Sequence, residues 1–114
     1  MNACRSRDHC KRGNDPKAAL LDYERAVTIS PTYALGFYGR ARAKSSLGDA
    51  AGSVADYTKT IALNPNHAEA YDDRGYAFML KLGKTLQGCQ DWKRACELGR
   101  CTNYNLAKTR KMCQ

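Results

Sequence analysis

The chain repeats itself at a fixed interval. The pairs Asp22-Tyr23, Asp56-Tyr57 and Asp91-Trp92 recur at spacings of 34 and 35 residues, and Pro31 returns in the same phase as Pro65. A period of this length is typical of stacked supersecondary units, none of which can bury its apolar face alone. The sequence therefore predicts a repeat solenoid. Such arrays usually present a curved surface to a partner instead of carrying out a reaction.

Capping and turn signals predict two helices in the clearest unit, residues 31–64. Thr32 is expected to cap a helix that runs to Leu47 and stops at Gly48. Asp49 is expected to start a second helix that ends at Asn64-Pro65. This unit is thus a helix-turn-helix pair.

The neighbouring units follow the same pattern with two differences. The unit after it carries one extra residue before Leu82-Gly83, which we expect at the helix–helix corner, where added length is tolerated. The unit before it is half present. Asp15-Pro16 predicts a helix that continues to about Ile29, because Asp caps well and Pro suits the first helical position.

The in-phase positions over roughly residues 14–100 resemble the tetratricopeptide repeat family. They are Phe37, Ala41, Leu47-Gly48, Ser53, Tyr57, Thr60, Leu63, Pro65, Tyr71, Gly75, Leu82-Gly83, Trp92, Ala95 and Leu98. The opening Tyr71-x-x-Arg74-Gly75 looks like a common bacterial variant, and the run from Lys93 to Lys108 is similar to cysteine-containing Sel1-like repeats. The resemblance implies an all-α, antiparallel helix-turn-helix repeat solenoid, a superhelix closed by a C-terminal capping helix.

The expected organisation has three parts. Residues 1–13 are mostly charged and are expected to form a degenerate or frayed N-terminal segment. Residues 14–101 are expected to hold one half repeat and two full repeats. Residues 102–114 are expected to form the capping helix that covers the exposed end of the stack.

The resemblance also implies a concave groove lined by the first helix of each unit. The residues expected to line it are Leu35, Tyr38, Arg42 and Ser45 in one unit and Glu69, Asp72, Tyr76 and Met79 in the next. Each set steps by three, four and three residues and so occupies one helical face. Tyr, Met and Arg suit adaptable contacts and carboxylate recognition. The expected partner is another protein, bound as an extended peptide or a helix.

Some family members clamp the C-terminal carboxylate of a peptide with Lys and Asn on this face. The corresponding positions here hold Tyr38, Arg42 and Asp73, so that clamp is not reproduced. Binding of chaperone tails is therefore disfavoured.

The cysteines leave three interpretations open. Cys89 and Cys96 lie seven residues apart on one helical face, and Cys101 and Cys113 follow in the expected cap. If the cap folds back as a hairpin, the pairing that fits best is Cys89 with Cys113 and Cys96 with Cys101. Reduced, buried thiols are the default in a reducing compartment. A four-thiolate zinc site is the third interpretation, although close Cys-x-x-Cys pairs are missing.

Composition limits the remaining functions. The net charge is +8, and Arg100, Lys108, Arg110 and Lys111 concentrate it in the cap, where a solubilising role is favoured over nucleic-acid contact because no aromatic or Gly-rich motif accompanies the charges. Residues 1–10 have no apolar stretch typical of a secretory signal, which predicts a cytoplasmic protein; a fragment with oxidised cysteines would instead be periplasmic or secreted. No apolar run is long enough to span a membrane.

No catalytic constellation is evident in the sequence. His9 and His67 are the only histidines, and the glycines lie at helix ends and helix contacts instead of in a phosphate-binding loop. We predict a non-catalytic interaction module without cofactor or metal. The alternatives are a structural C-terminal portion of a larger repeat scaffold, or weak nucleic-acid contact through the basic cap.

Overall fold

The computed structural model describes residues 15–113 of the 114-residue chain, so the expectation for residues 1–13 lies outside the described residues. The described part is helical and contains no strand. Its elements are α2 (Pro16–Ile29), α3 (Ala34–Ser46), α4 (Ala50–Leu63), α5 (Ala68–Tyr76), a π-helical turn η1 (Ala77–Lys81), α6 (Thr85–Glu97) and α7 (Thr102–Thr109).

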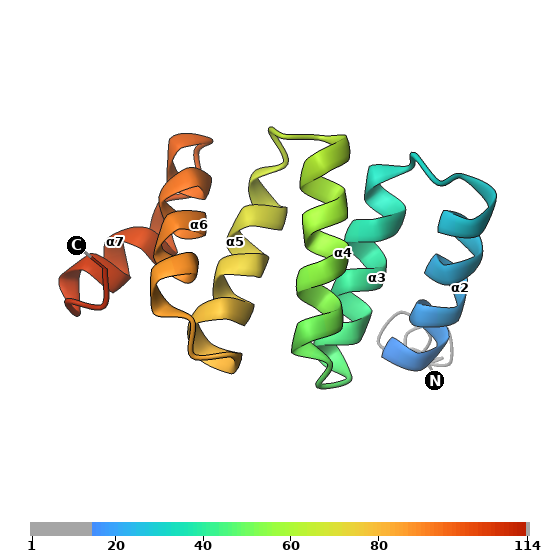
Figure 1. The fold of residues 1–114 in the computed structure, drawn as a ribbon, viewed down its shortest axis with the longest axis horizontal. Coiled ribbons are helices and arrows are strands. Elements are labelled where there is room, and N and C mark those ends of the chain that lie inside the picture. The colour runs from blue at the N-terminus through green and yellow to red at the C-terminus, as the bar shows by residue number, and fades with distance from the viewer. Residues whose placement is uncertain (1–14, 114) are drawn as a thin grey trace, which may run out of the picture.

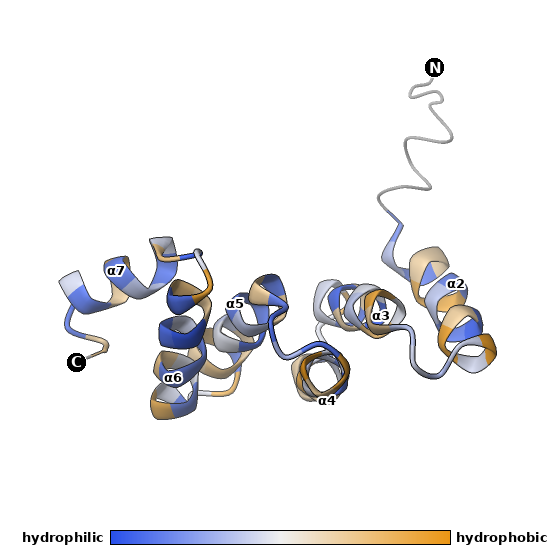
Figure 2. Ribbon diagram, turned by 90° about the horizontal axis from the view of Figure 1, so that it is seen from above, coloured by the Kyte–Doolittle hydropathy of each residue, from blue (hydrophilic) through white to orange (hydrophobic). Residues whose placement is uncertain are grey.

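Consecutive helices run antiparallel and stand side by side from α2 to α6, and α7 crosses the far end of the row (Figure 1). Viewed from above, α4 is set to one side of α3 and α5, so that the helices form two staggered layers (Figure 2). The described chain measures 46 × 32 × 24 Å. This is the predicted all-α, antiparallel helix-turn-helix solenoid.

Aspartate caps begin two of the helices at the expected residues. The Asp15 carboxylate accepts a hydrogen bond from the backbone N–H of Lys17 at 3.0 Å, and the Asp49 carboxylate accepts one from the N–H of Gly52 at 2.9 Å. These bonds satisfy N–H groups that have no partner within the helix.

The predicted cap at Thr32 is wrong. Helix α3 begins at Ala34, and its N-cap is Tyr33, which makes no side-chain capping bond. The backbone N–H of Tyr33 donates to the carbonyl of Ser30 at 3.0 Å, which closes a turn over Pro31 and Thr32. Thr32 therefore lies inside the turn, one residue too early to cap the helix.

The extra residue of the third unit is not at the corner between helices, as the sequence suggested, but inside the end of the first helix of that unit. Residues Ala77–Lys81 form a π-helical turn, and the backbone N–H of Leu82 donates to the carbonyl of Ala77 at 3.0 Å. A π turn accommodates one inserted residue without breaking the helix. The chain therefore keeps its antiparallel stacking from α5 into α6.

Two arginine–aspartate pairs tie the first helix of a unit to the second. Arg40 donates from Nε and one terminal nitrogen to both oxygens of Asp56, each at 2.8 Å, and Arg74 binds Asp91 in the same way at 2.8 Å. Lys44 Nζ lies 3.1 Å from an Asp56 oxygen. Bidentate pairs of this kind fix the geometry of the two helices as well as contributing energy.

The C-terminal end is closed by α7 and by two cystine bridges. The structure joins Cys89 to Cys113, with 5.6 Å between their Cα atoms, and Cys96 to Cys101, with 3.9 Å. Cys113 is buried in a core cluster with Met79, Trp92 and Ala107. No described group of three or more His, Cys, Asp and Glu side chains is arranged to hold a metal ion.

None of the helices described is both long and apolar enough to cross a membrane.

Gly48 offers a clean test of backbone conformation at the α3–α4 turn. Its φ is +87°, and a Cβ added there would meet no atom within 4 Å. Gly48→Ala should therefore lower the free energy of unfolding by about 1 kcal/mol through backbone strain alone. Urea denaturation measures the change. Gly48→Asn should lose less of the free energy of unfolding, because Asn tolerates this backbone conformation better than Ala does. Equal losses for the Ala and Asn variants would contradict the explanation.

Candidate functional site

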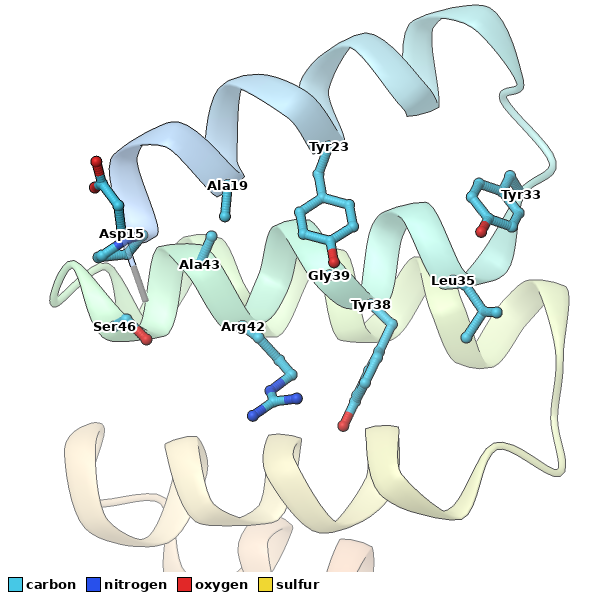
Figure 3. A pocket seen from close by; sticks show the side chains of 11 residues that line it. Asp15, Ala19, Tyr23, Tyr33, Leu35, Tyr38, Gly39, Arg42, Ala43 and Ser46 are labelled. Carbon is cyan, nitrogen blue, oxygen red and sulfur yellow. The ribbon is translucent and has the colours of Figure 1, made fainter. Parts of the chain in front are cut away.

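The larger of two neighbouring hollows lies between α2 and α3. Its volume is about 600 Å³, and Figure 3 shows the side chains around it. Its lining residues are Asp15, Pro16, Ala19, Tyr23, Tyr33, Leu35, Tyr38, Gly39, Arg42, Ala43 and Ser46. The Tyr23 ring lies directly over Gly39, where any Cβ would collide with it. The glycine therefore lets an aromatic ring form one wall of the hollow.

The smaller hollow lies between α3 and α5 and has a volume of about 190 Å³. Its lining residues are Arg42, Ser45, Ser46, Tyr57, Asp73 and Tyr76. Arg42 and Ser46 line both hollows. The two hollows thus form one surface, which we call the groove, with Arg42 at the ridge between them.

A hydrogen bond across the groove fixes Tyr38. Its hydroxyl donates to Asp73 Oδ2 at 2.8 Å, and its ring centroid lies 4.6 Å from that of His67 and 5.9 Å from that of Tyr57. Burial, and then the bond to Asp73, raise the pKa of the Tyr38 hydroxyl above its ordinary value, so it remains a protonated donor. Tyr38 is therefore a rigid aromatic wall instead of a mobile side chain.

Arg42 is the exposed cation of this surface. It extends from α3 toward α5 beside Tyr38 (Figure 3), and its guanidinium carbon lies 5.9 Å from the Tyr38 ring centroid. A guanidinium near an aromatic face is attracted to it but keeps its hydrogen-bond donors available. Arg42 can therefore bind a carboxylate or a peptide carbonyl of a ligand.

The structure brings together most of the residues that the sequence assigned to the groove. Leu35, Tyr38 and Arg42 line the larger hollow, while Arg42, Ser45 and Tyr76 line the smaller one. Glu69 is exposed at the start of α5 but lines neither hollow.

The prediction of the groove lining is wrong for two residues, Met79 and Asp72. Met79 is 7% exposed and belongs to the core cluster under the C-terminal end. Asp72 is 8% exposed, and its carboxylate accepts hydrogen bonds from Asn103 at 2.9 Å and Arg100 at 3.3 Å. Helix α7 and the turn before it pack over this part of α5. Met79 therefore packs in the core at the C-terminal end and Asp72 binds the C-terminal segment, so neither side chain lines the groove.

Helical periodicity does not identify Tyr57 or the contribution of α2 to the groove. Asp73, which the resemblance places at a clamp position of this face, accepts the hydrogen bond from Tyr38. Tyr23 lines the larger hollow and is the second residue of the first repeated pair, Asp22-Tyr23. The recurrence of this pair was the feature of the sequence that could have identified Tyr23. Side chains from four helices, α2, α3, α4 and α5, therefore line a surface that the resemblance assigned to two.

Asp73 predicts a specific pH dependence of stability. Burial raises the pKa of its carboxyl group above the ordinary value, and this outweighs the opposing influence of the Tyr38 hydroxyl and the Arg42 guanidinium. A carboxyl group with a raised folded-state pKa contributes stability that is fully present below its unfolded pKa, about 4, and is lost as pH rises through the folded value. Asp73→Asn should therefore raise the free energy of unfolding at neutral pH, because the amide oxygen can still accept from Tyr38.

The measurement is urea denaturation of parent and variant across the acid-to-neutral range. The advantage of the variant should shrink as pH falls toward about 4. Asp22→Asn, at an exposed position of α2, is the control for a general charge effect. A variant that is less stable than the parent at neutral pH would contradict the proposed cost of burying this carboxylate.

Comparison with known proteins places the fold. No family model matches the chain. Over 59 residues it is 37% identical to serine/threonine-protein phosphatase T of Trypanosoma brucei brucei, a match that covers 52% of this chain and 12% of the phosphatase. This chain therefore matches only a small part of the phosphatase, and the match implies nothing about phosphatase activity in this chain.

Two solved structures are similar over nearly the whole chain. The first TPR of Spaghetti (RPAP3), bound to the HSP90 peptide SRMEEVD, has a TM-score of 0.79 and 25% identity, and the match covers 95% of this chain and 84% of that one. The second TPR domain of human RPAP3, in complex with the HSP70 peptide SGPTIEEVD, has a TM-score of 0.77 and 24% identity, with 95% and 88% covered. Domains of this kind are generally non-catalytic interaction modules. The helical fold is that of a tetratricopeptide repeat domain.

Proposed function

We propose that this chain is a protein-interaction module that binds an extended peptide or a helix of a partner protein along the groove between α2, α3 and α5. The observation that carries the proposal is the position of Arg42, exposed between two hollows and flanked by tyrosine rings. Tyr38 is already fixed by Asp73, so little side-chain freedom remains to be lost when a ligand binds. The peptides bound by the two similar structures support a peptide as the ligand.

The chemistry of the groove favours a ligand different from those two peptides. Arg42 is joined in the smaller hollow by Asp73, a carboxylate that would repel an acidic peptide end. The Lys and Asn of the carboxylate clamp are also absent. We therefore expect the peptides SRMEEVD and SGPTIEEVD to bind weakly, and isothermal titration with each would measure this.

A peptide-display selection on the purified chain tests the groove itself. The test variant is Arg42→Glu combined with Tyr76→Ala, because both side chains are exposed and neither supports the core. The matched control is Arg25→Glu combined with Leu80→Ala, which makes similar changes at exposed positions outside both hollows. A shared peptide motif that is lost in the test variant and kept in the control is the expected result. A motif retained by both variants, with unchanged circular dichroism, would refute groove binding.

The alternative is a structural role within a larger repeat scaffold. The observation in its favour is the exposed apolar surface of α2, where Leu21 is 56% and Ile29 is 80% exposed. Under this alternative, an added upstream repeat should raise the free energy of unfolding cooperatively.

Three further parts of the proposal rest on sequence pattern alone. They are the Sel1-like character of the C-terminal end, the bacterial type of the repeats and a cytoplasmic location.

A further inference from the structure

A separate hollow lies at the opposite end of the molecule from α2, between α6 and the segment that follows α7. Its volume is about 540 Å³, and its lining residues are Thr85, Leu86, Cys89, Gln90, Lys93, Tyr104, Met112 and Cys113. It shares no residue with the groove. Helix α7 spans only Thr102–Thr109 and therefore leaves the first turns of α6 uncovered.

Apolar side chains line this hollow and remain exposed to water. Leu86 is 70% exposed and Met112 is 37% exposed, whereas Cys113 beneath them is buried at 4%. Cys89 and Tyr104 pack against the core cluster that contains Trp92 and Cys113. The hollow thus has a firm floor and an apolar rim, which suits an inserted side chain.

The surroundings of the hollow are basic. Residues 84–113 contain two acidic side chains, Asp91 and Glu97, and each already pairs with an arginine. Five cations of this segment form no ion pair with any described residue: Lys84, Lys93, Lys108, Arg110 and Lys111. Lys93 lines the hollow, and Lys108 Nζ lies 4.8 Å from the ring centroid of Tyr104. An occupant therefore meets an apolar cavity within a positive field.

We propose that this hollow is a second docking site, which takes an apolar side chain of an acidic peptide segment of a partner protein. The apolar side chain would contact Leu86 and Met112, while the flanking carboxylates would face Lys93 and Lys108. A second copy of the chain is disfavoured as the occupant, because each copy carries the same basic rim and a net charge of +8. An anionic membrane would suit a protruding apolar patch better than a hollow of about 540 Å³.

The test uses the full 15N-labelled chain and a synthetic peptide in which one phenylalanine is flanked on both sides by aspartates and glutamates. The expected result is a set of amide shifts confined to the residues around the hollow. Replacement of the phenylalanine by serine should weaken binding about tenfold, because the apolar contact is lost. An increase of the salt concentration should weaken it further, since exposed charges are screened.

Variants of the chain separate the two contributions. Leu86→Ser should weaken binding about tenfold, and so should Lys93→Glu combined with Lys108→Glu. The matched controls are Leu21→Ser, and Lys17→Glu combined with Arg25→Glu, at exposed positions of α2 at the other end of the stack. These controls should bind the peptide as the parent does, and so should the groove variant Arg42→Glu.

Any one of the following results would overturn the proposal. The peptide could fail to bind, the amide shifts could fall on α3 and α5, or the affinity could be indifferent to Leu86→Ser. The last such result is binding to phosphatidylserine vesicles, but not to the peptide, with the same dependence on Leu86 and Lys93. Because Arg42→Glu leaves this site intact, failure here is distinguishable from failure of groove binding.

Discussion

Trp92→Ala should lower the free energy of unfolding by about 4 kcal/mol, a large fraction of the stability of a domain of this size. Trp92 is 5% exposed, and its indole N–H donates to the backbone carbonyl of Asp72 at 3.0 Å. Its ring packs against Gly75, where α5 and α6 approach closely. The substitution therefore removes core volume, a buried hydrogen bond and the contact between two helices together.

Urea denaturation followed by circular dichroism measures the loss. Trp92→Phe should recover more than half of it, because the ring is largely kept and only the N–H bond disappears. Leu86→Ala, at a 70% exposed position of the same helix, should change stability by no more than about 0.5 kcal/mol. A loss below about 1 kcal/mol for Trp92→Ala would show that the C-terminal core contributes little to folding.

Asp56→Ala should lower the free energy of unfolding by about 3 kcal/mol, because it removes a carboxylate shared by two cations. The Asp56 side chain is 6% exposed, while Arg40 and Lys44 are 23% and 22% exposed. Their remaining access to water lets them regain part of their hydration, which keeps the cost below that of a fully buried broken pair.

A double variant separates the ion pair from its packing. Asp56→Leu combined with Arg40→Leu removes the carboxylate and one of its two cations and supplies apolar volume. Only the partly exposed Lys44 loses its partner, so the double variant should lose less than half as much stability as Asp56→Ala. Both variants would be compared by chemical denaturation at neutral pH. An equal or larger loss in the double variant would mean that the pair is more favourable than a well-packed apolar contact at this site.

The sequence predicts the fold well because the information lies in local signals. The spacing of Asp22, Asp56 and Asp91 sets the repeat, and the caps at Asp15 and Asp49 and the turn at Gly48 set helix ends. Each depends on a few neighbouring residues and on backbone chemistry. Such local signals predict the same helix ends whichever other helices pack against them.

The candidate site is less predictable because it depends on how helices meet. A regular helix extrapolated from Glu69 puts Met79 on the groove face, but the π turn at Ala77–Lys81 changes the rotation per residue before Met79 is reached. Asp72 is buried because Arg100 and Asn103 of the C-terminal end fold onto it. Neither the position of the π turn nor the docking of α7 follows from helical periodicity.

The bridge between Cys89 and Cys113 gives the molecule a defined response to mechanical load. It links α6 directly to the segment beyond α7, across a sequence separation of 24. A pulling force applied after Cys113 therefore reaches α6 without stretching α7. When the chain is unfolded by force, its extension should be shorter than that of the reduced chain by the length of the bridged segment, about 80 Å when fully extended. The C-terminal end can thus bear tension while the surface around α7 keeps its shape.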